Sequence, residues 1–349
     1  MRHRPRRADR RTVLLTGASG VVGQALLGRF RDADVLCLTH RTPVAGPGVR
    51  SVHGDVSQPR FGLPSPAWRD LAASVDAVVH AAAVTDFNGP DTVLTRTNVE
   101  GTRHAVELAA TAGAPFYHVS SAYLHAREDD GRGRTAVRYA ASKRAAESLV
   151  RQSGIPHTIL RPSVVVGDSR TGETAAFQGL HKVAEGIMGG LVPIIPFDAD
   201  WPIDIVPRDV VADAVTTLVE RGHVGGELWL TAGERAPRLA ETVDVLVDVA
   251  AEAGISVSPP KFVAPEMFDR LIAPVFLDAL PPHIRKTATR LLDFFAAYLA
   301  LERALPSDLP QLERLGVTPL PDSRESLRLS LRYWIKKTLP VGTSDREVA

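Results

Sequence analysis

Short apolar runs alternate with amphipathic segments along the first two thirds of the chain. The run 12–16 is apolar and β-rich, the next seven positions hold three glycines, and 21–30 continues with apolar residues at helical spacing. This order predicts a strand, a glycine turn and a helix. The same periodicities predict further strands at 34–39, 49–56, 75–80, 116–120, 158–166 and 227–231, and helices at 92–112, 139–152 and 206–220. Such alternation predicts an α/β fold, a Rossmann-type doubly wound parallel sheet.

The pattern changes after Gly167. Glycines and prolines cluster between 186 and 207, which is typical of a loop that covers a site, so about 167–207 is predicted to be a substrate loop. Further helices are expected at 239–253, 286–305 and 323–337. The predicted domains are a basic, flexible N-terminus at 1–10, a doubly wound domain at 11–233, and a smaller, mostly helical substrate-binding region at 234–349.

Composition narrows the class of protein. Hydrophobic residues make up 44% of the 349 positions and charged residues 23%, as in ordinary globular proteins. The formal net charge of +1 gives no field that would attract nucleic acid, and no apolar run approaches the ~20 residues of a transmembrane helix. The single cysteine, Cys37, excludes internal disulfides, and the histidines show no metal-ligand spacing. We therefore expect a cytoplasmic protein without a metal site, a nucleic-acid partner or a transmembrane segment.

The glycine turn carries the first chemical signal. Its glycines follow a G-x-x-G-x-x-G spacing, which lets the backbone approach a pyrophosphate at the start of a helix. Because the turn lies between a predicted strand and a predicted helix, it predicts a dinucleotide site and makes 11–233 an NAD(P)-binding domain. The expected contacts to the cofactor are Gly17, Ala18, Ser19, Gly20, Val21, Val22 and Gly23.

The next two strands bear on the choice of cofactor. The second strand ends at Arg41 without the acidic residue that usually binds the ribose hydroxyls of NAD, and an arginine there suits the 2′-phosphate of NADP. NADP(H) is therefore favoured over NAD(H), although a solvent-facing arginine at a strand end is also common. Asp55, followed by Val56, is placed to accept a hydrogen bond from the adenine amino group. An aspartate that caps a turn would occupy the same position.

A tyrosine and a lysine lie one helical turn apart at Tyr139 and Lys143. An ammonium group beside a phenol lowers the pKa of the phenol, so the tyrosine can exchange a proton with a carbonyl or alcohol oxygen during hydride transfer. Ser121, at the end of a predicted strand, could hydrogen-bond the same oxygen. No G-x-S-x-G elbow surrounds this serine, which argues against a hydrolase. Without the glycine turn, the Tyr–Lys pair would more often be an ordinary packed and solvated pair.

Together, T-G-x-x-G-x-x-G and Y-x-x-x-K resemble the extended branch of the short-chain dehydrogenase/reductases over most of the chain. The resemblance implies that Ser121, Tyr139 and Lys143 are the catalytic residues. Ser120 competes with Ser121, because only the register of the strand distinguishes two adjacent serines. The segments 80–83, 98–102 and 161–167 resemble the family's cofactor-contacting segments, so the resemblance adds to the cofactor site Ala81, Ala82, Asn98, Pro162, Ser163 and Val164, besides Tyr139 and Lys143.

Within that superfamily, the sequence is similar to the thioester reductase and fatty acyl-CoA reductase group. The matching stretches are G-D-x-x-x-P-x-x-G-L at 54–63, G-D-S-x-T-G at 167–172, D-x-V-P-x-D-x-V at 204–211 and L-R-Y-W at 331–334. The resemblance implies an NADPH-dependent reductase that transfers hydride to a carbonyl or acyl thioester, carried on CoA or a carrier protein, with Tyr139 as proton donor. The substrate could equally be another small carbonyl compound, and a homodimer is a family expectation.

Two other classes stay open at this stage. An NAD-dependent sugar-nucleotide epimerase or dehydratase would share the fold and hold its dinucleotide tightly, although the stretches at 54–63 and 167–172 speak against it. A non-catalytic NADP-binding protein would be expected to have lost either Tyr139 or Lys143, and this chain has both.

Overall fold

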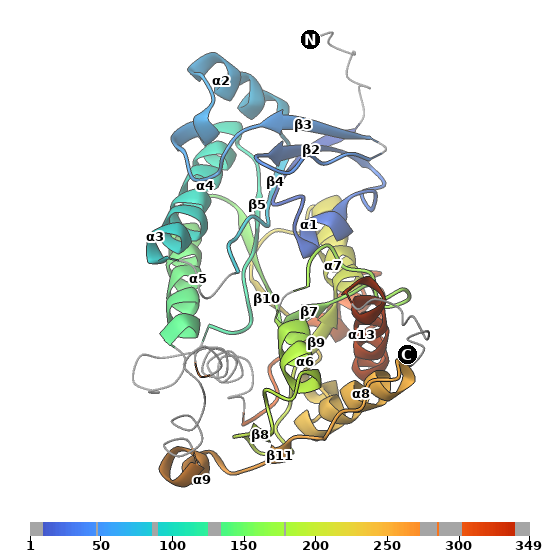
Figure 1. The fold of residues 1–349 in the computed structure, drawn as a ribbon. Coiled ribbons are helices and arrows are strands. Elements are labelled where there is room, and N and C mark those ends of the chain that lie inside the picture. Colours follow the sequence, from blue (N-terminus) through green and yellow to red (C-terminus); the bar gives the residue numbers. More distant parts are fainter. Residues whose placement is uncertain are drawn as a thin grey trace, which may run out of the picture.

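The computed structural model of the chain describes residues 10–46, 48–85, 90–124, 134–177, 179–272, 285 and 302–338. Seven parallel strands form its central sheet (Figure 1). In the order in which they lie side by side, these are β10 (Glu227–Leu230), β6 (His157–Pro162), β5 (Phe116–Val119), β4 (Ala77–His80), β1 (Arg11–Thr16), β2 (Ala33–Thr39) and β3 (Val49–His53). The strand order reverses between β1 and β4, where open α/β sheets bind their ligands. The predicted doubly wound Rossmann-type sheet is confirmed.

Helices cover both faces of this sheet because successive strand residues point to opposite sides. In β1, Leu15 packs in a core shared with α1 (Val21–Leu26) and α7 (Arg208–Glu220). Its neighbour Leu14 packs in the opposite core. That core is formed with α2 (Ser65–Ser74), α4 (Gly101–Ala112) and α5 (Arg134–Gln152). Strands buried on both faces account for the continuous apolar runs in the sequence.

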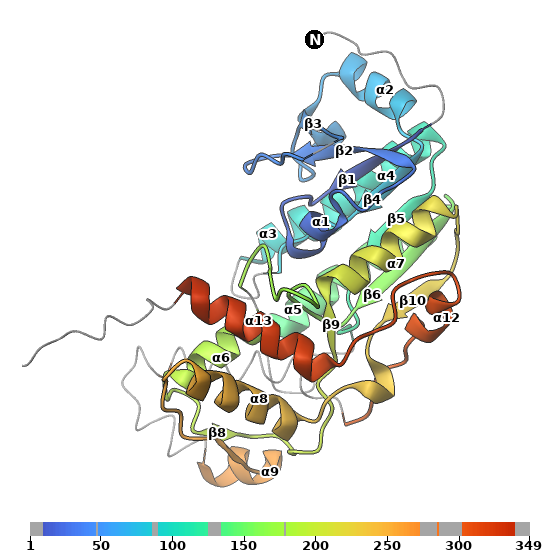
Figure 2. The same ribbon diagram turned by 90° about the vertical axis from the view of Figure 1, so that its right-hand side faces the viewer.

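A second group of elements has its own apolar core. Figure 2 shows its main helices gathered below the sheet: α6 (Leu180–Met188), α8 (Leu239–Glu252) and α13 (Ser323–Thr338). Two small parallel pairs join it, β7 (Val164–Val166) with β9 (Ile205–Pro207), and β8 (Ile194–Ile195) with β11 (Lys261–Phe262). Shorter helical elements are η1 (Pro59–Gly62), α3 (Asp91–Leu94), η2 (Thr95–Glu100), η4 (Gly233–Arg235), α9 (Pro265–Met267), η5 (Phe268–Ile272) and α12 (Leu309–Glu313). Within the described ranges, no helix has the length and apolar character needed to cross a membrane.

Several predicted elements differ in detail. The strand expected at 158–166 is two strands, because after Pro162 the chain leaves β10 and pairs with β9 instead. The region 186–207 is not one long loop, since α6 ends inside it and β8 and β9 follow. Helix α2 was not predicted. The helix expected at 286–305 lies almost wholly outside the described residues.

The region predicted as 234–349 does not form one separate unit. Leu309, Leu312, Val317 and Leu320 return to the sheet domain and pack in the same core as α1 and α7. Residues on both sides of the predicted boundary near 233 therefore share the core of the sheet domain.

Helix α13 holds the loop 167–172 by direct backbone contact. Gly172 has φ +71°, and a Cβ atom there would lie 2.0 Å from the carbonyl oxygen of Leu329 in α13. The amide of Gly167 donates to Ser330 Oγ at 3.1 Å. At the other side of the loop, Ser169 donates from its backbone and its hydroxyl to Asp209 of α7, at 2.8 and 2.6 Å. The G-D-S-x-T-G stretch thus joins the C-terminal helix to the sheet domain.

Replacing Gly172 by alanine should therefore destabilise the fold more than the backbone conformation alone explains. Gly154→Ala is the matched control, because Gly154 has φ +70° but no atom within 4 Å of its would-be Cβ. We expect Gly154→Ala to lower the free energy of unfolding by ~1 kcal/mol and Gly172→Ala by a further ~1–3 kcal/mol, measured by urea denaturation. Equal losses in the two variants would contradict the close contact with α13.

Candidate active site

The glycine turn between β1 and α1 is tightly packed against the chain that follows β4. A Cβ on Gly17 would lie 2.5 Å from the carbonyl carbon of Ala81 and 2.5 Å from the amide nitrogen of Ala82. A Cβ on Gly23 would lie 2.0 Å from the Gly17 oxygen. Gly20 donates its amide to the same oxygen at 3.0 Å. Two of the three glycines are therefore required by backbone packing, which brings the turn and the end of β4 together.

Two cavities open on either side of this turn. One, of about 410 Å³, is lined by Gly17, Ala18 and Ser19 and by the ends of β2 and β3. The other, of about 320 Å³, is lined by residues 19–23 and by the end of β5 and the helix α5. Ser19 lines both cavities, so the glycine turn forms the passage between them. Two lobes joined at a glycine turn are the shape that a dinucleotide requires.

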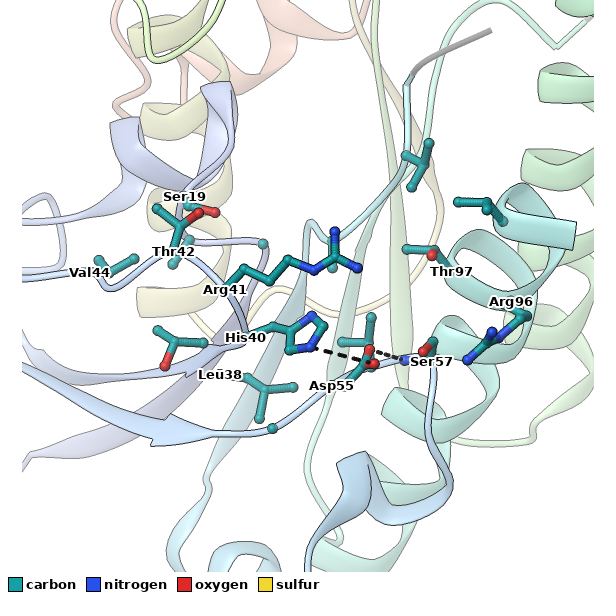
Figure 3. A pocket seen from close by; sticks show the side chains of 18 residues that line it. Ser19, Leu38, His40, Arg41, Thr42, Val44, Asp55, Ser57, Arg96 and Thr97 are labelled. Atoms are coloured by element: carbon teal, nitrogen blue, oxygen red, sulfur yellow. Dashed lines mark hydrogen bonds and ion pairs between the residues drawn. The ribbon is translucent and has the colours of Figure 1, made fainter. Parts of the chain in front are cut away.

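The larger cavity brings together Arg41, Asp55 and Val56 of the predicted cofactor site. Figure 3 shows the Arg41 side chain reaching across the cavity from the end of β2. In the described part of the chain, no carboxylate oxygen lies within 4.0 Å of its guanidinium. An additional arginine that sequence analysis missed, Arg96, enters from η2 on the other side.

Asp55 is held in place by the loop that follows it. Its carboxylate accepts from the Ser57 amide at 2.9 Å and lies 3.8 Å from His40 Nε2, and its own amide donates to the Phe61 oxygen at 3.0 Å. Burial acts to raise the pKa of this carboxyl, but the hydrogen bonds from Ser57 and the charges of His40 and Arg96 lower it overall. Asp55 thus caps a turn and also presents an ionised acceptor to the cavity, so the two interpretations of this residue are compatible.

Asn98 lies behind the cavity wall. The segment Thr95–Glu100 is a π-helical turn inside the longer helix, and it buries the Asn98 side chain. Its side-chain amide accepts from Val84 N at 2.8 Å and donates to Ser142 Oγ at 3.0 Å. Ser142 Oγ in turn donates to the backbone carbonyl oxygen of Tyr139 at 2.7 Å. Asn98 lines neither cavity, and its contacts tie the chain after β4 to the helix that carries Tyr139.

The smaller cavity brings together Ser121, Tyr139 and Lys143. The side chains of Ser121 and Tyr139 are hydrogen-bonded to each other, and Lys143 Nζ donates to the Val119 oxygen at 2.9 Å. Ser120 makes a different contact, since its hydroxyl donates to Glu147 Oε1 at 2.6 Å. The predicted cofactor contacts that also line this cavity are Val21, Val22, Ala81, Pro162, Ser163 and Val164, whereas Ala82 lines the larger one.

Burial controls the protonation states in this cavity. It raises the pKa of Tyr139 to about 12, against the smaller effect of the hydrogen bond with Ser121, so the phenol is protonated at neutral pH. The pKa of Tyr139 is thus raised, contrary to the lowering that we expected from Lys143. Burial lowers the pKa of Lys143 to about 8, and the charge of Glu147 acts in the opposite direction. The site therefore offers a neutral phenol next to an ammonium group that can lose its proton just above neutral pH.

His80, at the end of β4, supports the cavity from behind. Its Nδ1 lies 2.8 Å from Thr16 Oγ1 at the end of β1, and its Nε2 lies 3.2 Å from Thr102 Oγ1 in α4. Burial and the charge of Lys143 lower the pKa of His80 to about 3. The imidazole is therefore neutral and bridges the sheet and its covering helix.

A family model and several known proteins match parts of this sequence. The family model described as male sterility protein, an NAD-binding family, matches residues 42–215. The chain is 31% identical over 246 residues to one of the subunits of linear gramicidin synthase from Brevibacillus parabrevis, and 34% identical over 210 residues to the L-2-aminoadipate reductase large subunit of Penicillium chrysogenum. These alignments cover 58% and 51% of this chain but only 5% and 15% of the relatives, so the chain corresponds to a small part of each.

Several solved structures share the fold over nearly the whole chain. The terminal R domain from the myxalamid PKS-NRPS biosynthetic pathway superposes with a TM-score of 0.72 and 25% identity, covering 96% of this chain and 93% of that one. A reductase domain of a nonribosomal peptide synthetase from Mycobacterium tuberculosis gives 0.66 and 22%, with 94% and 92% covered. UDP-glucuronic acid 4-epimerase from Bacillus cereus shares the fold, with a TM-score of 0.64 at 15% identity and coverage of 93% and 99%.

The neutral state of His80 predicts a loss of stability in mild acid. Its pKa of about 3 in the folded protein lies below the ordinary value of 6.5, so between these pH values the unfolded chain binds a proton that the folded protein does not. His80 should therefore cost ~2 kcal/mol of folding free energy at pH 5 relative to pH 7.

Urea denaturation at pH 5 and pH 7 measures this loss. His80→Asn should show a smaller drop between the two pH values than the unmodified protein, and the exposed His223→Asn should not change the drop. A pH dependence that is the same with and without His80 would show that the imidazole is not buried in its neutral form.

Proposed function

We propose that this chain, whose residues 42–215 match the NAD-binding male sterility family, is an NAD(P)-dependent oxidoreductase of the extended short-chain dehydrogenase/reductases, in their thioester-reductase-like group, and that it reduces acyl thioesters with NADPH. One observation carries the proposal: Ser121, Tyr139 and Lys143 share the wall of one cavity, which the glycine turn joins to a second, arginine-lined cavity.

The residues of this chain fit the cofactor. The turn 17–23 would hold the pyrophosphate, Asp55 the adenine, and Lys143 the nicotinamide ribose. The tight packing of Gly17 against Ala81 and Ala82 supports this assignment, because only a residue without a Cβ lets the turn lie this close to the end of β4, between the two cavities. When bound, the reduced nicotinamide supplies hydride to the carbonyl carbon of the substrate.

The protein's own part in the reaction is to bind the carbonyl oxygen and to protonate it. Ser121 would donate a hydrogen bond to this oxygen, and Tyr139, protonated at neutral pH, would give up its proton to the oxygen as negative charge develops there. Lys143 lies one turn further along the same helix, and its positive charge would stabilise the phenolate that results. A thioester that gains hydride and a proton becomes a hemithioacetal, which releases a thiol and leaves an aldehyde.

The preference for NADPH rests on Arg41. Its guanidinium lies in the larger cavity without a carboxylate partner among the described residues, at the position where an NAD-specific site would have an acid. A 2′-phosphate would supply the missing counter-charge. Arg96, from the other side of the cavity, adds positive charge to the same lobe.

The acyl donor that we propose is a thioester on CoA or on a carrier protein. Similarity to the parts of peptide synthetases and of aminoadipate reductase that match this chain supports this choice. A thiolation-reductase di-domain from an archaeal nonribosomal peptide synthetase, with a TM-score of 0.67 at 17% identity, shows the same fold beside a thiolation domain. The cytoplasmic location and the homodimer stay predictions.

Removing the phenolic hydroxyl of Tyr139 should abolish reduction. In Tyr139→Phe we expect NADPH oxidation in the presence of a medium-chain or long-chain acyl-CoA to fall by ~100-fold or more, because no proton reaches the carbonyl oxygen. NADPH absorbance at 340 nm measures the rate, and Tyr333→Phe in α13 is the control that removes a phenol elsewhere.

The same experiment separates the remaining classes. Turnover that persists in Tyr139→Phe would exclude this tyrosine as the proton donor. Tight binding of NADPH without turnover would direct the search to other carbonyl substrates or to a non-catalytic NADP-binding protein. NAD retained through purification would favour the sugar-nucleotide epimerase class, which shares this fold.

Arg41→Ala should weaken NADPH binding and leave NADH binding unchanged. Loss of charge-assisted hydrogen bonds to a 2′-phosphate corresponds to ~10–100-fold in the dissociation constant, measured by cofactor fluorescence. Arg50→Ala, an exposed arginine on β3 outside the cavity, is the matched control. If NADPH and NADH lose affinity equally, Arg41 does not read the 2′-phosphate.

A further inference from the structure

Helix α5 carries a third ionisable residue in line with Tyr139 and Lys143. Glu147 follows Lys143 by four residues, as Lys143 follows Tyr139, so the three share one face of the helix. Its side chain is 2% exposed, which is rare for a carboxylate and costly unless the charge is fully compensated. Sequence analysis did not select Glu147, although the four-residue spacing could have indicated it.

The buried carboxylate is fully hydrogen-bonded. Oε1 accepts from Ser120 Oγ at 2.6 Å and from Arg161 Nε at 2.9 Å. Oε2 accepts from Arg161 at 2.7 Å and from Arg151 at 2.6 Å. Arg161 also binds Glu227 of β10 at 2.5 Å, so Glu147 connects α5 to β6 and, through the arginine, to β10.

The bond with Ser120 determines which serine faces Tyr139. The backbone at this point continues alongside β6, with Ser120 N donating to the Leu160 oxygen at 2.7 Å and Ala122 N to the Pro162 oxygen at 2.9 Å. In extended chain, adjacent side chains point to opposite sides. With Ser120 bound to Glu147, Ser121 is directed to the other side, where it is hydrogen-bonded to Tyr139.

Glu147 is also the acidic group that acts on Lys143. Lys143 is 2% exposed, and burial disfavours the charge of its ammonium group. The other ionisable groups near it are His80 on β4 and His118 on β5, which burial keeps neutral, and Tyr139 on its own helix. Beyond Glu147 lie Arg151, Arg161 and Glu227. Without the charge of Glu147, the two arginines would share the carboxylate of Glu227 alone, and Lys143 would lose the negative charge one helical turn away.

We propose that Glu147 is a positioning residue of this active site, which fixes Ser120 so that Ser121 faces Tyr139 and places a negative charge one helical turn from Lys143. The proposal rests on the reductase function proposed above. Glu147 touches neither cavity, so it would act only through these two neighbours.

The test separates the charge of Glu147 from its hydrogen bond with Ser120. Glu147→Gln keeps an acceptor oxygen for Ser120 but removes the charge and the hydrogen bonds that Oε2 accepts from the two arginines, so Lys143 should lose its proton at lower pH. We expect the alkaline limb of the pH profile of kcat/KM, and of NADPH affinity measured by fluorescence without substrate, to move down by about one pH unit. Glu227→Gln, which removes a carboxylate from the same arginines without touching Ser120, is the matched control and should leave both limbs in place.

Ser120→Ala tests the positioning role. Removal of the Ser120 hydroxyl should lower kcat by roughly 5- to 10-fold with unchanged NADPH affinity and an unchanged alkaline limb. Unshifted limbs in Glu147→Gln together with a full kcat in Ser120→Ala would overturn the proposal. If Glu147→Gln does not fold, as judged by thermal unfolding, Ser120→Ala decides alone, and a full kcat there overturns it.

Failure of the reductase proposal would look different. Absence of NADPH oxidation in the unmodified protein with acyl-CoA would remove the proposed reaction, while the pH dependence of NADPH affinity in Glu147→Gln would still report on Lys143. A shifted affinity limb supports the role of Glu147 beside Lys143 even then, and an unshifted one rejects it.

Discussion

The close approach of the glycine turn to the chain after β4 is the constraint on which both cavities depend. Gly17 packs against the backbone of Ala81 and Ala82 with no room for a side chain, at the point where the strand order of the sheet reverses. Because β1 and β4 are adjacent and parallel, their carboxyl ends diverge into separate connections there and leave a crevice. The glycine turn divides this crevice into two lobes that meet at Ser19.

Two charged side chains are buried beside that crevice. Lys143 and Glu147 lie on one helix, and each is nearly inaccessible to solvent. Such burial is stable only where each charge has partners, and here most partners come from the strand ends: the Val119 carbonyl oxygen for the ammonium, and Ser120 with Arg161 for the carboxylate, which Arg151 of the same helix also binds. The same contacts that compensate the charges therefore fix helix α5 against β5 and β6.

Helix α13 joins the second group of elements to the sheet domain. It closes the apolar core of α6 and α8, and its backbone packs against Gly172 in the loop 167–172. Asp209 at the start of α7 holds the opposite side of that loop through Ser169. A stretch of sequence that resembles a family signature is thus also a structural joint between the last helix and the sheet.

The sequence by itself determined the local elements and the class of site. Periodicity and the glycine spacing are local properties, so the parallel sheet, the turn at 17–23 and the pairing of Tyr139 with Lys143 could be predicted with no knowledge of long-range contacts. The end of the strand at Pro162, the different hydrogen-bond partners of Ser120 and Ser121, the place of Asn98 outside both cavities and the position of Arg96 in the larger cavity could not be predicted in this way. Only the tertiary structure decided these, because each depends on a partner distant in sequence: β9 for the strand after Pro162, Glu147 for Ser120, and Ser142 for Asn98. Protonation followed the same rule, since burial among elements far apart in the chain, more than neighbouring charge, sets the pKa values of Tyr139, Lys143 and His80.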